Sequence, residues 1–122
     1  MGILVVDDDL GFRNAVGVYL ELEGYHVMTA GDGLEALQIL KTRMKPKIII
    51  LDLVMPVIDG WSFLKLLRSH ESYTQARVLV VSTVIDEEIC KIADGCLRKP
   101  FELESLLHLI QEHWSKTITH FQ

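Results

Sequence analysis

Five side chains capable of chemistry lie where apolar runs of the sequence end. The run "ILVV" is followed by Asp7 and Asp8, "IIIL" by Asp52, "VLVV" by Ser82, and "CLR" by Lys99. Three carboxylates brought together repel, since a like-charged pair about 4 Å apart costs about 4 kcal/mol at an effective dielectric near 20. A bound cation removes that repulsion, so carboxylate oxygens beside a hydroxyl and an amine predict a Mg²⁺ site next to a phosphoryl group. There the carboxylate of Asp52 is a candidate nucleophile that forms an aspartyl phosphate, and Ser82 and Lys99 contact phosphoryl oxygens.

These side chains can meet only if the segments between them fold in a regular order. Short β-branched runs predict strands at residues 3–6, 25–30, 48–51, 77–81 and 96–98. Apolar residues at helical spacing predict helices that begin near residues 12, 33, 60, 87 and 103. The fourth helix should end by Ala93 and the fifth at about Trp114.

Strict alternation of strand and helix predicts a parallel sheet with helices on both faces, because the crossovers are right-handed. Among doubly wound α/β folds, five strands suit the flavodoxin-like order 2-1-3-4-5. Function in such sheets gathers at the carboxyl ends of the strands. The five side chains are therefore expected to share one pocket.

Composition narrows the class of protein further. With 122 residues and 49% hydrophobic residues, the chain is expected to be one domain, with a core over residues 3–114 and a short tail over 115–122. No apolar run approaches the roughly 20 residues of a membrane span, and we see no signal peptide, so a cytoplasmic protein without membrane contact is expected. The net charge of −5 argues against direct nucleic-acid binding. Cys90 and Cys96 are interpreted as two free thiols.

Four motifs in order resemble the receiver domain of two-component response regulators. They are "ILVVDDD", "IIILDLVMPVIDG", "VLVVS" and "LRKPF", and the resemblance extends from Ile3 to about Trp114. It implies that a histidine kinase or a histidine phosphotransfer protein donates the phosphoryl group. The domain would catalyse its own phosphorylation and dephosphorylation without being a turnover enzyme. Its downstream protein target is unknown, and a homodimer is compatible with this function.

Matched position by position, the resemblance implies a metal site. Asp52 would be the phosphoacceptor and also a ligand of Mg²⁺, or of another divalent cation such as Mn²⁺. Asp8 would be the more direct of the two remaining acidic ligands and Asp7 an indirect one, while the backbone carbonyl of Val54 would be a further ligand.

The resemblance also implies a switch, and here the chain departs from the family pattern. Ser82 would be the switch hydroxyl and Lys99 the contact to the phosphoryl group, with a cis peptide before Pro100. Thr83 replaces a small residue, and Cys96 replaces an aromatic ring that would follow the hydroxyl. The segment between Ser82 and Lys99 is shorter than is usual, so the fourth helix should be truncated and the output face unusual or the switch weaker.

Val54 and Val84 are expected to flank the path of water towards the aspartyl phosphate. Neither side chain can orient that water by hydrogen bonding, so hydrolysis is expected to be slow.

Two alternatives remain open. A phosphatase of the haloacid dehalogenase class would use Asp7 as nucleophile and Asp9 as acid–base, although Leu10 and Gly11 depart from that motif. A receiver-like module could instead act by protein contact without phosphorylation. We favour a helix cap for Asp9, a turn for Asp59 and Gly60, and surface positions for the five histidines, which are His26, His70, His108, His113 and His120.

Overall fold

The predicted alternation of strands and helices is confirmed by the computed structural model, which describes residues 2–42, 45–69 and 75–118. The strands are β1 (Ile3–Val6), β2 (Val27–Ala30), β3 (Ile48–Leu51), β4 (Arg77–Ser82) and β5 (Gly95–Arg98). The helices are α1 (Leu10–Leu22), α2 (Gly33–Thr42), α3 (Gly60–Ser69), α4 (Glu87–Ile92) and α5 (Leu103–Ile118). All strand pairs are parallel and the order is β2-β1-β3-β4-β5, as predicted.

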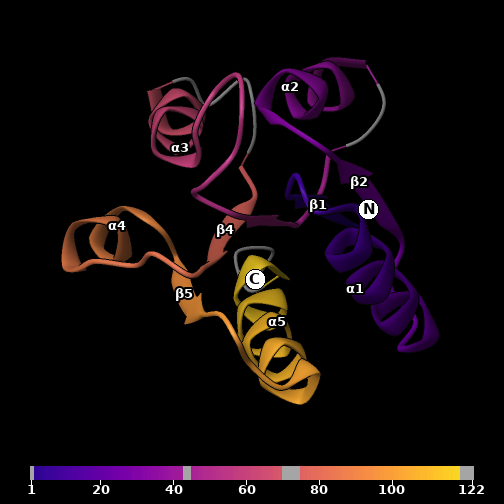
Figure 1. The fold of residues 1–122 in the computed structure, drawn as a ribbon. Coiled ribbons are helices and arrows are strands. Elements are labelled where there is room, and N and C mark those ends of the chain that lie inside the picture. Colours follow the sequence, from indigo (N-terminus) through magenta and orange to yellow (C-terminus); the bar gives the residue numbers. More distant parts are fainter. Residues whose placement is uncertain (1, 43–44, 70–74, 119–122) are drawn as a thin grey trace.

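Helices cover both faces of the sheet (Figure 1). One face carries α2, α3 and α4, and the other carries α1 and α5. Along β3, Ile49 and Leu51 pack into the core cluster on the first face, whereas Ile48 and Ile50 pack into the cluster on the second. Every residue of β1 and β3 is buried, which explains why both strands are continuous apolar runs.

Aspartates cap four helices, as their positions before helical segments suggested, and at the start of α2 Asp32 accepts a hydrogen bond from the amide of Glu35 at 2.9 Å. The side chain of Asp9 accepts a hydrogen bond from the amide of Phe12 at 3.1 Å at the start of α1, and Asp86 accepts from Ile89 at 2.9 Å at the start of α4. At the start of α3, Asp59 accepts from the amide of Ser62 at 2.9 Å. These contacts satisfy amides that have no partner within the first helical turn.

The fourth helix has only six residues, which confirms the predicted truncation. Two residues connect it to β5, and the second of them, Asp94, is held from three directions. Its carboxylate lies 2.6 Å from Arg68 of α3 and 3.1 Å from Arg77 of β4, and it accepts from the amide of Val78 at 2.7 Å. Burial raises the pKa of Asp94, but these hydrogen bonds and the arginine charges outweigh burial and leave the pKa below its usual value. Asp94 thus fixes the short α4–β5 connection to the sheet.

Two predicted boundaries were wrong. Helix α5 continues to Ile118, so residues 115–118 are helical rather than a tail, because neither glycine nor proline interrupts the helix. Strand β2 begins at Val27 rather than Tyr25, because the amide of Tyr25 bonds to the carbonyl of Leu20 and so closes α1.

The histidine prediction was wrong for one residue. His113 is only 6% exposed because it shares a face of α5 with the buried Leu106 and Ile110. His26 and His108 are exposed as expected, and His70 and His120 lie outside the described residues. Within the described part of the chain, no helix is both long and apolar enough to span a bilayer.

Candidate functional site

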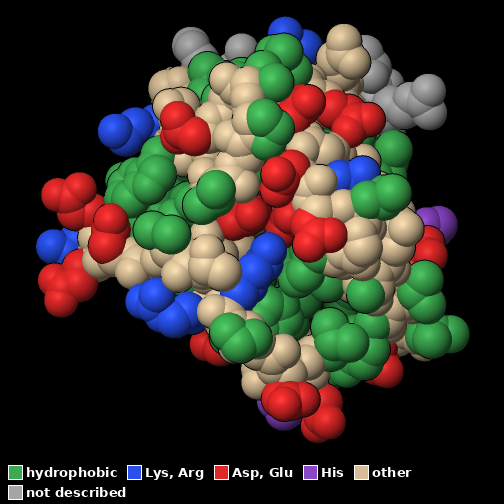
Figure 2. Space-filling view, viewed as in Figure 1, with side chains coloured by type: hydrophobic (Ala, Val, Ile, Leu, Met, Phe, Trp, Pro, Cys, Tyr) green, Lys and Arg blue, Asp and Glu red, His purple; other side chains and the backbone are tan. Residues whose placement is uncertain are grey.

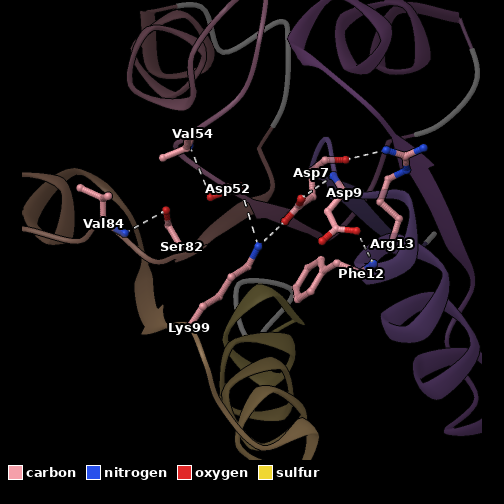
Figure 3. A network of polar contacts seen from close by, with 9 residues as sticks. All are labelled: Asp7, Asp9, Phe12, Arg13, Asp52, Val54, Ser82, Val84 and Lys99. Atoms are coloured by element: carbon pink, nitrogen blue, oxygen red, sulfur yellow. Dashed lines mark hydrogen bonds and ion pairs between the residues drawn. The ribbon is translucent and has the colours of Figure 1, made fainter.

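The carboxyl ends of β1 and β3 bring three acidic side chains together, two of which, Asp7 and Asp52, are drawn in Figure 3. β1 and β3 pair in parallel, and the amide of Asp52 donates to the carbonyl of Val6 at 3.0 Å. Carboxylate oxygens of Asp7, Asp8 and Asp52 all lie within 4.8 Å of one another. At that separation two carboxylates repel by about 3.5 kcal/mol at an effective dielectric near 20. The predicted convergence of the three acids is therefore confirmed, and the cluster favours a nearby positive charge.

Lys99 supplies one such charge. Its Nζ lies 2.7 Å from Oδ2 of Asp7 and 3.8 Å from Oδ2 of Asp52. The lysine follows β5, and its amide donates to the carbonyl of Ser82 at 2.9 Å, which anchors this residue to the end of β4. The peptide bond between Lys99 and Pro100 is cis, as the resemblance implied. The amine thus points into the acidic cluster, as Figure 3 shows.

Asp7 is the most deeply buried of the acids. Only 1% of the residue is exposed, compared with 7% of Asp52, whereas Asp8 is exposed. Burial raises the pKa of the Asp7 carboxyl, although hydrogen bonds from Lys99 and from the amide of Asp9 oppose that shift. Even with Lys99 in place, the ionised form of Asp7 is therefore disfavoured relative to a carboxylate in water.

The third predicted group, Ser82, is buried at the end of β4. Its Oγ accepts a hydrogen bond from the amide of Val84 at 3.3 Å. Just after the neighbouring strand β3, the amide of Val54 donates to Oδ1 of Asp52 at 3.4 Å. Two backbone amides therefore hold the hydroxyl and the carboxylate from the loops that follow β4 and β3.

Val54 and Val84 are themselves 56% and 53% exposed. In Figure 3 their backbone amides face Asp52 and Ser82, and their side chains extend away from these two residues. Two exposed apolar residues thus lie next to Asp52 and Ser82, and their effect on an attacking water stays a prediction. Thr83, between Ser82 and Val84, is also exposed.

The donor set fits a hard divalent cation. It consists of three carboxylates, of which the exposed Asp8 leaves an approach for water. Mg²⁺ prefers a few carboxylate oxygens and keeps several of its waters, so this set suits it. Figure 2 shows acidic side chains gathered near the middle of this face, with a basic side chain against them.

Two residues of α1 complete the site, and the sequence reading missed them. Nη1 of Arg13 donates to the backbone carbonyl of Asp7 at 2.7 Å, which secures the turn after β1. The ring of Phe12 lies under the Lys99 amine, with 4.0 Å between Nζ and the ring centroid. The available signal was their position in the first helical turn after an acidic strand end.

The loop after Asp52 passes close to the strand. A Cβ at Gly60 would collide with the carbonyl oxygen of Asp52 and the Cα of Leu53, so only glycine fits there. The same loop holds Val57 at a φ of 71°, a conformation that β-branched residues rarely adopt. Gly60 and the capping Asp59 therefore serve the turn into α3, as the sequence reading favoured.

Cys96 lies apart from the acidic cluster. It is half-buried on β5, opposite Val80 of β4, and packs against the core cluster under α2, α3 and α4. Of the predicted site residues, Cys96 alone thus lies on β5, away from the acidic cluster and Lys99.

Comparison with known proteins identifies the family. Residues 3–111 match the family described as "Response regulator receiver domain". The DNA-binding dual master transcriptional regulator RpaA of Synechocystis sp. is 36% identical over 110 residues, which are 86% of this chain and 45% of RpaA. The chain spans about half the length of the curated relatives it matches.

Solved structures agree with this assignment. The chemotaxis protein CheY4 of Vibrio cholerae superposes with a TM-score of 0.79 at 37% identity, covering 90% of this chain and 95% of CheY4. The response regulator TrrA of Thermotoga maritima, in complex with Mg²⁺ and BeF, has a TM-score of 0.81 at 27% identity and covers 91% of this chain and 96% of its own. Fold, acidic cluster and sequence thus agree that this chain belongs to the receiver domain family of two-component response regulators and is a phosphorylation-dependent signalling module.

Proposed function

We propose that Asp52 accepts a phosphoryl group from a phosphohistidine of a histidine kinase or a histidine phosphotransfer protein. The observation that carries this proposal is the position of Asp52 at the end of β3, where its carboxylate lies within 4.8 Å of those of Asp7 and Asp8 and 3.8 Å from the Lys99 amine. A carboxylate oxygen of Asp52 attacks phosphorus while the bond from phosphorus to the donor imidazole nitrogen breaks. The imidazole leaves with the electron pair of that bond and takes up a proton.

The acidic cluster supports a role for Mg²⁺, or Mn²⁺, in this transfer. Asp8 and Asp52 would bind the ion with the backbone carbonyl of Val54, and Asp7 would contact it indirectly through water. When bound, the ion offsets the repulsion among the carboxylates and withdraws charge from a phosphoryl oxygen. The likeness to TrrA, which was solved with Mg²⁺ and BeF, is consistent with such a site.

Lys99 and Ser82 would contact the phosphoryl group on Asp52 and so respond to phosphorylation. Lys99 already faces the Asp52 carboxylate, so its amine can contact a phosphoryl oxygen after a small movement. The Ser82 hydroxyl would donate a hydrogen bond to another phosphoryl oxygen. It would lose the hydrogen bond that it now accepts from the amide of Val84. That exchange moves the loop after β4 and shifts an existing equilibrium between two conformations.

Two features suggest how this module differs from its relatives. Cys96 cannot swing as an aromatic ring would, so the response at α4 and β5 should be small, with Thr83 carrying part of it. Val54 and Val84, both exposed beside the site, cannot orient an attacking water, which supports a long-lived aspartyl phosphate.

The phosphatase alternative gains no support from the site. Asp9, which would be its acid–base residue, already caps α1 by accepting from the amide of Phe12. We also place the domain in the cytoplasm. We assign it no direct nucleic-acid contact because its net charge is −5. Its downstream target would be a protein, and RpaA illustrates that a related receiver sequence can occur in a DNA-binding regulator.

A kinase panel tests the proposal. Autophosphorylated histidine kinases are mixed with the domain, and transfer of labelled phosphate is followed over time. At least one kinase is expected to label the wild type, while Asp52→Asn remains unlabelled. Asp59→Asn, which alters an exposed acid of the same loop, is the matched control and should be labelled like the wild type. Labelling of Asp52→Asn at the wild-type rate would exclude Asp52 as the acceptor.

A further inference from the structure

The two cysteines of the chain, six residues apart, meet at the junction of α4 and β5. Cys90 is exposed on α4, and Cys96 is half-buried on β5. Only Ala93 and Asp94 separate the two elements, and Asp94 fixes this connection to α3 and β4. Cys90 of α4 and Arg98 of β5 line the same groove, and Cys96 lies two residues before Arg98, on the same face of β5. The two thiols are therefore neighbours, and Cys90 contributes to the raised pKa of the Cys96 thiol.

The two thiols differ in their surroundings. Cys90 lines an open groove together with Ile85, Asp86, Glu87, Lys91 and Arg98. Cys96 packs against the core. Burial raises the pKa of the Cys96 thiol to about 12, with further contributions from Cys90 and Asp86. Cys90 is thus accessible to an oxidant in solution, and Cys96 is a protected thiol held next to it.

We infer that Cys90 and Cys96 form a reversible disulfide that joins α4 to β5 when the domain encounters a hydroperoxide. The Cys90 sulfur attacks the peroxide O–O bond, which yields a sulfenic acid on Cys90 and an alcohol, or water from hydrogen peroxide. The Cys96 sulfur then attacks the Cys90 sulfur, the S–S bond forms and water leaves with the sulfenic oxygen. The two thiols together lose two electrons and two protons, which the peroxide takes up, and a dithiol reverses the reaction by exchange.

The position of this pair gives the disulfide a regulatory consequence, which rests on the proposed function. Arg98, two residues after Cys96, donates to the carbonyls of Thr83 and Ile85 at 3.2 and 3.1 Å. The segment that follows Ser82 is therefore tied to β5. A covalent link from Cys96 to α4 would restrain the same region when Ser82 moves towards a phosphoryl group.

Trypsin provides a direct test, because Lys91 lies between the two cysteines. Cleavage separates a peptide of residues 78–91, which contains Cys90, from one of residues 92–98, which contains Cys96. After treatment with hydrogen peroxide, alkylation of free thiols and digestion without reductant, the two peptides are expected to be joined. The intact protein should lose about 2 Da and both free thiols, and a dithiol should restore them.

Single variants give the matched controls. Neither Cys90→Ser nor Cys96→Ser should show the loss of mass, and Cys90→Ser should fold normally because Cys90 is exposed. In the reduced wild type at pH 8, iodoacetamide should label Cys90 at least about 10-fold faster than Cys96, since the thiolate is the reacting form.

Three results would overturn the inference. They are peptides 78–91 and 92–98 that remain separate, a gain of oxygen mass on Cys90 without cross-linking, and disulfide-bonded dimers in place of the internal bond. The peptide map of the wild type decides the matter even if Cys96→Ser does not fold. None of these measurements requires phosphorylation, so their failure would leave the role of Asp52 untouched, and a failure at Asp52 would leave the disulfide standing.

Discussion

Replacement of Lys99 by methionine tests the electrostatic account of the acidic cluster. Methionine keeps an unbranched side chain near Phe12 and removes the charge together with the hydrogen bond that Lys99 donates to Asp7. Asp7 is only 1% exposed, and its carboxylate then loses the cation that lies 2.7 Å away. A buried charge without its partner destabilises the folded state unless it takes up a proton.

Proton uptake sets a ceiling on that loss. Each pH unit between the medium and the pKa is worth about 1.4 kcal/mol, so protonating a carboxyl of ordinary pKa 3.8 at pH 7 costs about 4.4 kcal/mol. Burial already raises the pKa of Asp7 in the wild type, which lowers the ceiling. We therefore expect Lys99→Met to lose about 3 kcal/mol of unfolding free energy at pH 7 without divalent cations, near the range for breaking a buried ion pair.

The loss should depend on pH with a definite sign. Without Lys99, the pKa of Asp7 in the folded state rises further. A carboxyl with a raised pKa in the folded state destabilises that state when it is ionised, and the penalty disappears below its pKa in the unfolded state. The difference between variant and wild type should therefore be greatest at neutral pH and shrink as the pH falls towards 3.8.

Urea unfolding followed by far-ultraviolet circular dichroism measures both effects. Measurements at several pH values in a chelating buffer compare the wild type, Lys99→Met and Lys65→Met, a change of an exposed lysine on α3 that should be within about 0.5 kcal/mol of the wild type. Added Mg²⁺ should return part of the stability lost by Lys99→Met, because it supplies positive charge to the same carboxylates. A loss below about 1 kcal/mol at pH 7, or one that does not change with pH, would refute the electrostatic reasoning.

Three further expectations concern other parts of the domain. Asp94→Ala should lower the unfolding free energy by about 2 kcal/mol, because it leaves the buried amide of Val78 without its acceptor and removes two ion pairs. Urea unfolding measures this loss, and a value below about 0.5 kcal/mol would contradict the expectation. Asp8→Asn should weaken Mg²⁺ binding at least about 10-fold in calorimetric titration, and unchanged affinity would remove Asp8 from the ligand set. Val54→Asn and Val84→Asn should each shorten the half-life of the phosphorylated domain by about 10-fold, as followed by loss of label. An already short half-life of the wild type would show that the valines do not protect the aspartyl phosphate.

The sheet and the acidic cluster followed from local sequence patterns. Uninterrupted β-branched runs mark strands that are buried on both faces, and parallel order then brings their carboxyl ends together. Asp7 and Asp52 could be placed beside each other for this reason alone. Helix caps such as Asp9 and Asp86 were equally visible, since a cap contacts amides within its own first turn.

Contacts between distant segments were not predictable in this way. The partners of Asp94, which are Arg68 and Arg77, lie 26 and 17 residues away along the chain, and no local pattern links them. The two cysteines were read as unrelated thiols, because their meeting depends on how the short connection between α4 and β5 folds back. Sequence reasoning thus found groups that share a sheet edge and missed groups that tertiary packing alone unites.

Stoichiometric phosphorylation of Asp52 tests the central claim most directly. The purified domain is treated with a small phosphoramidate, with Mg²⁺ or with a chelator, and its intact mass and the modified peptide are determined. We predict a gain of about 80 Da per molecule, located at Asp52, dependent on Mg²⁺ and absent from Asp52→Asn. A modification located on another residue, or no gain of mass in a folded domain that binds Mg²⁺, would contradict the account.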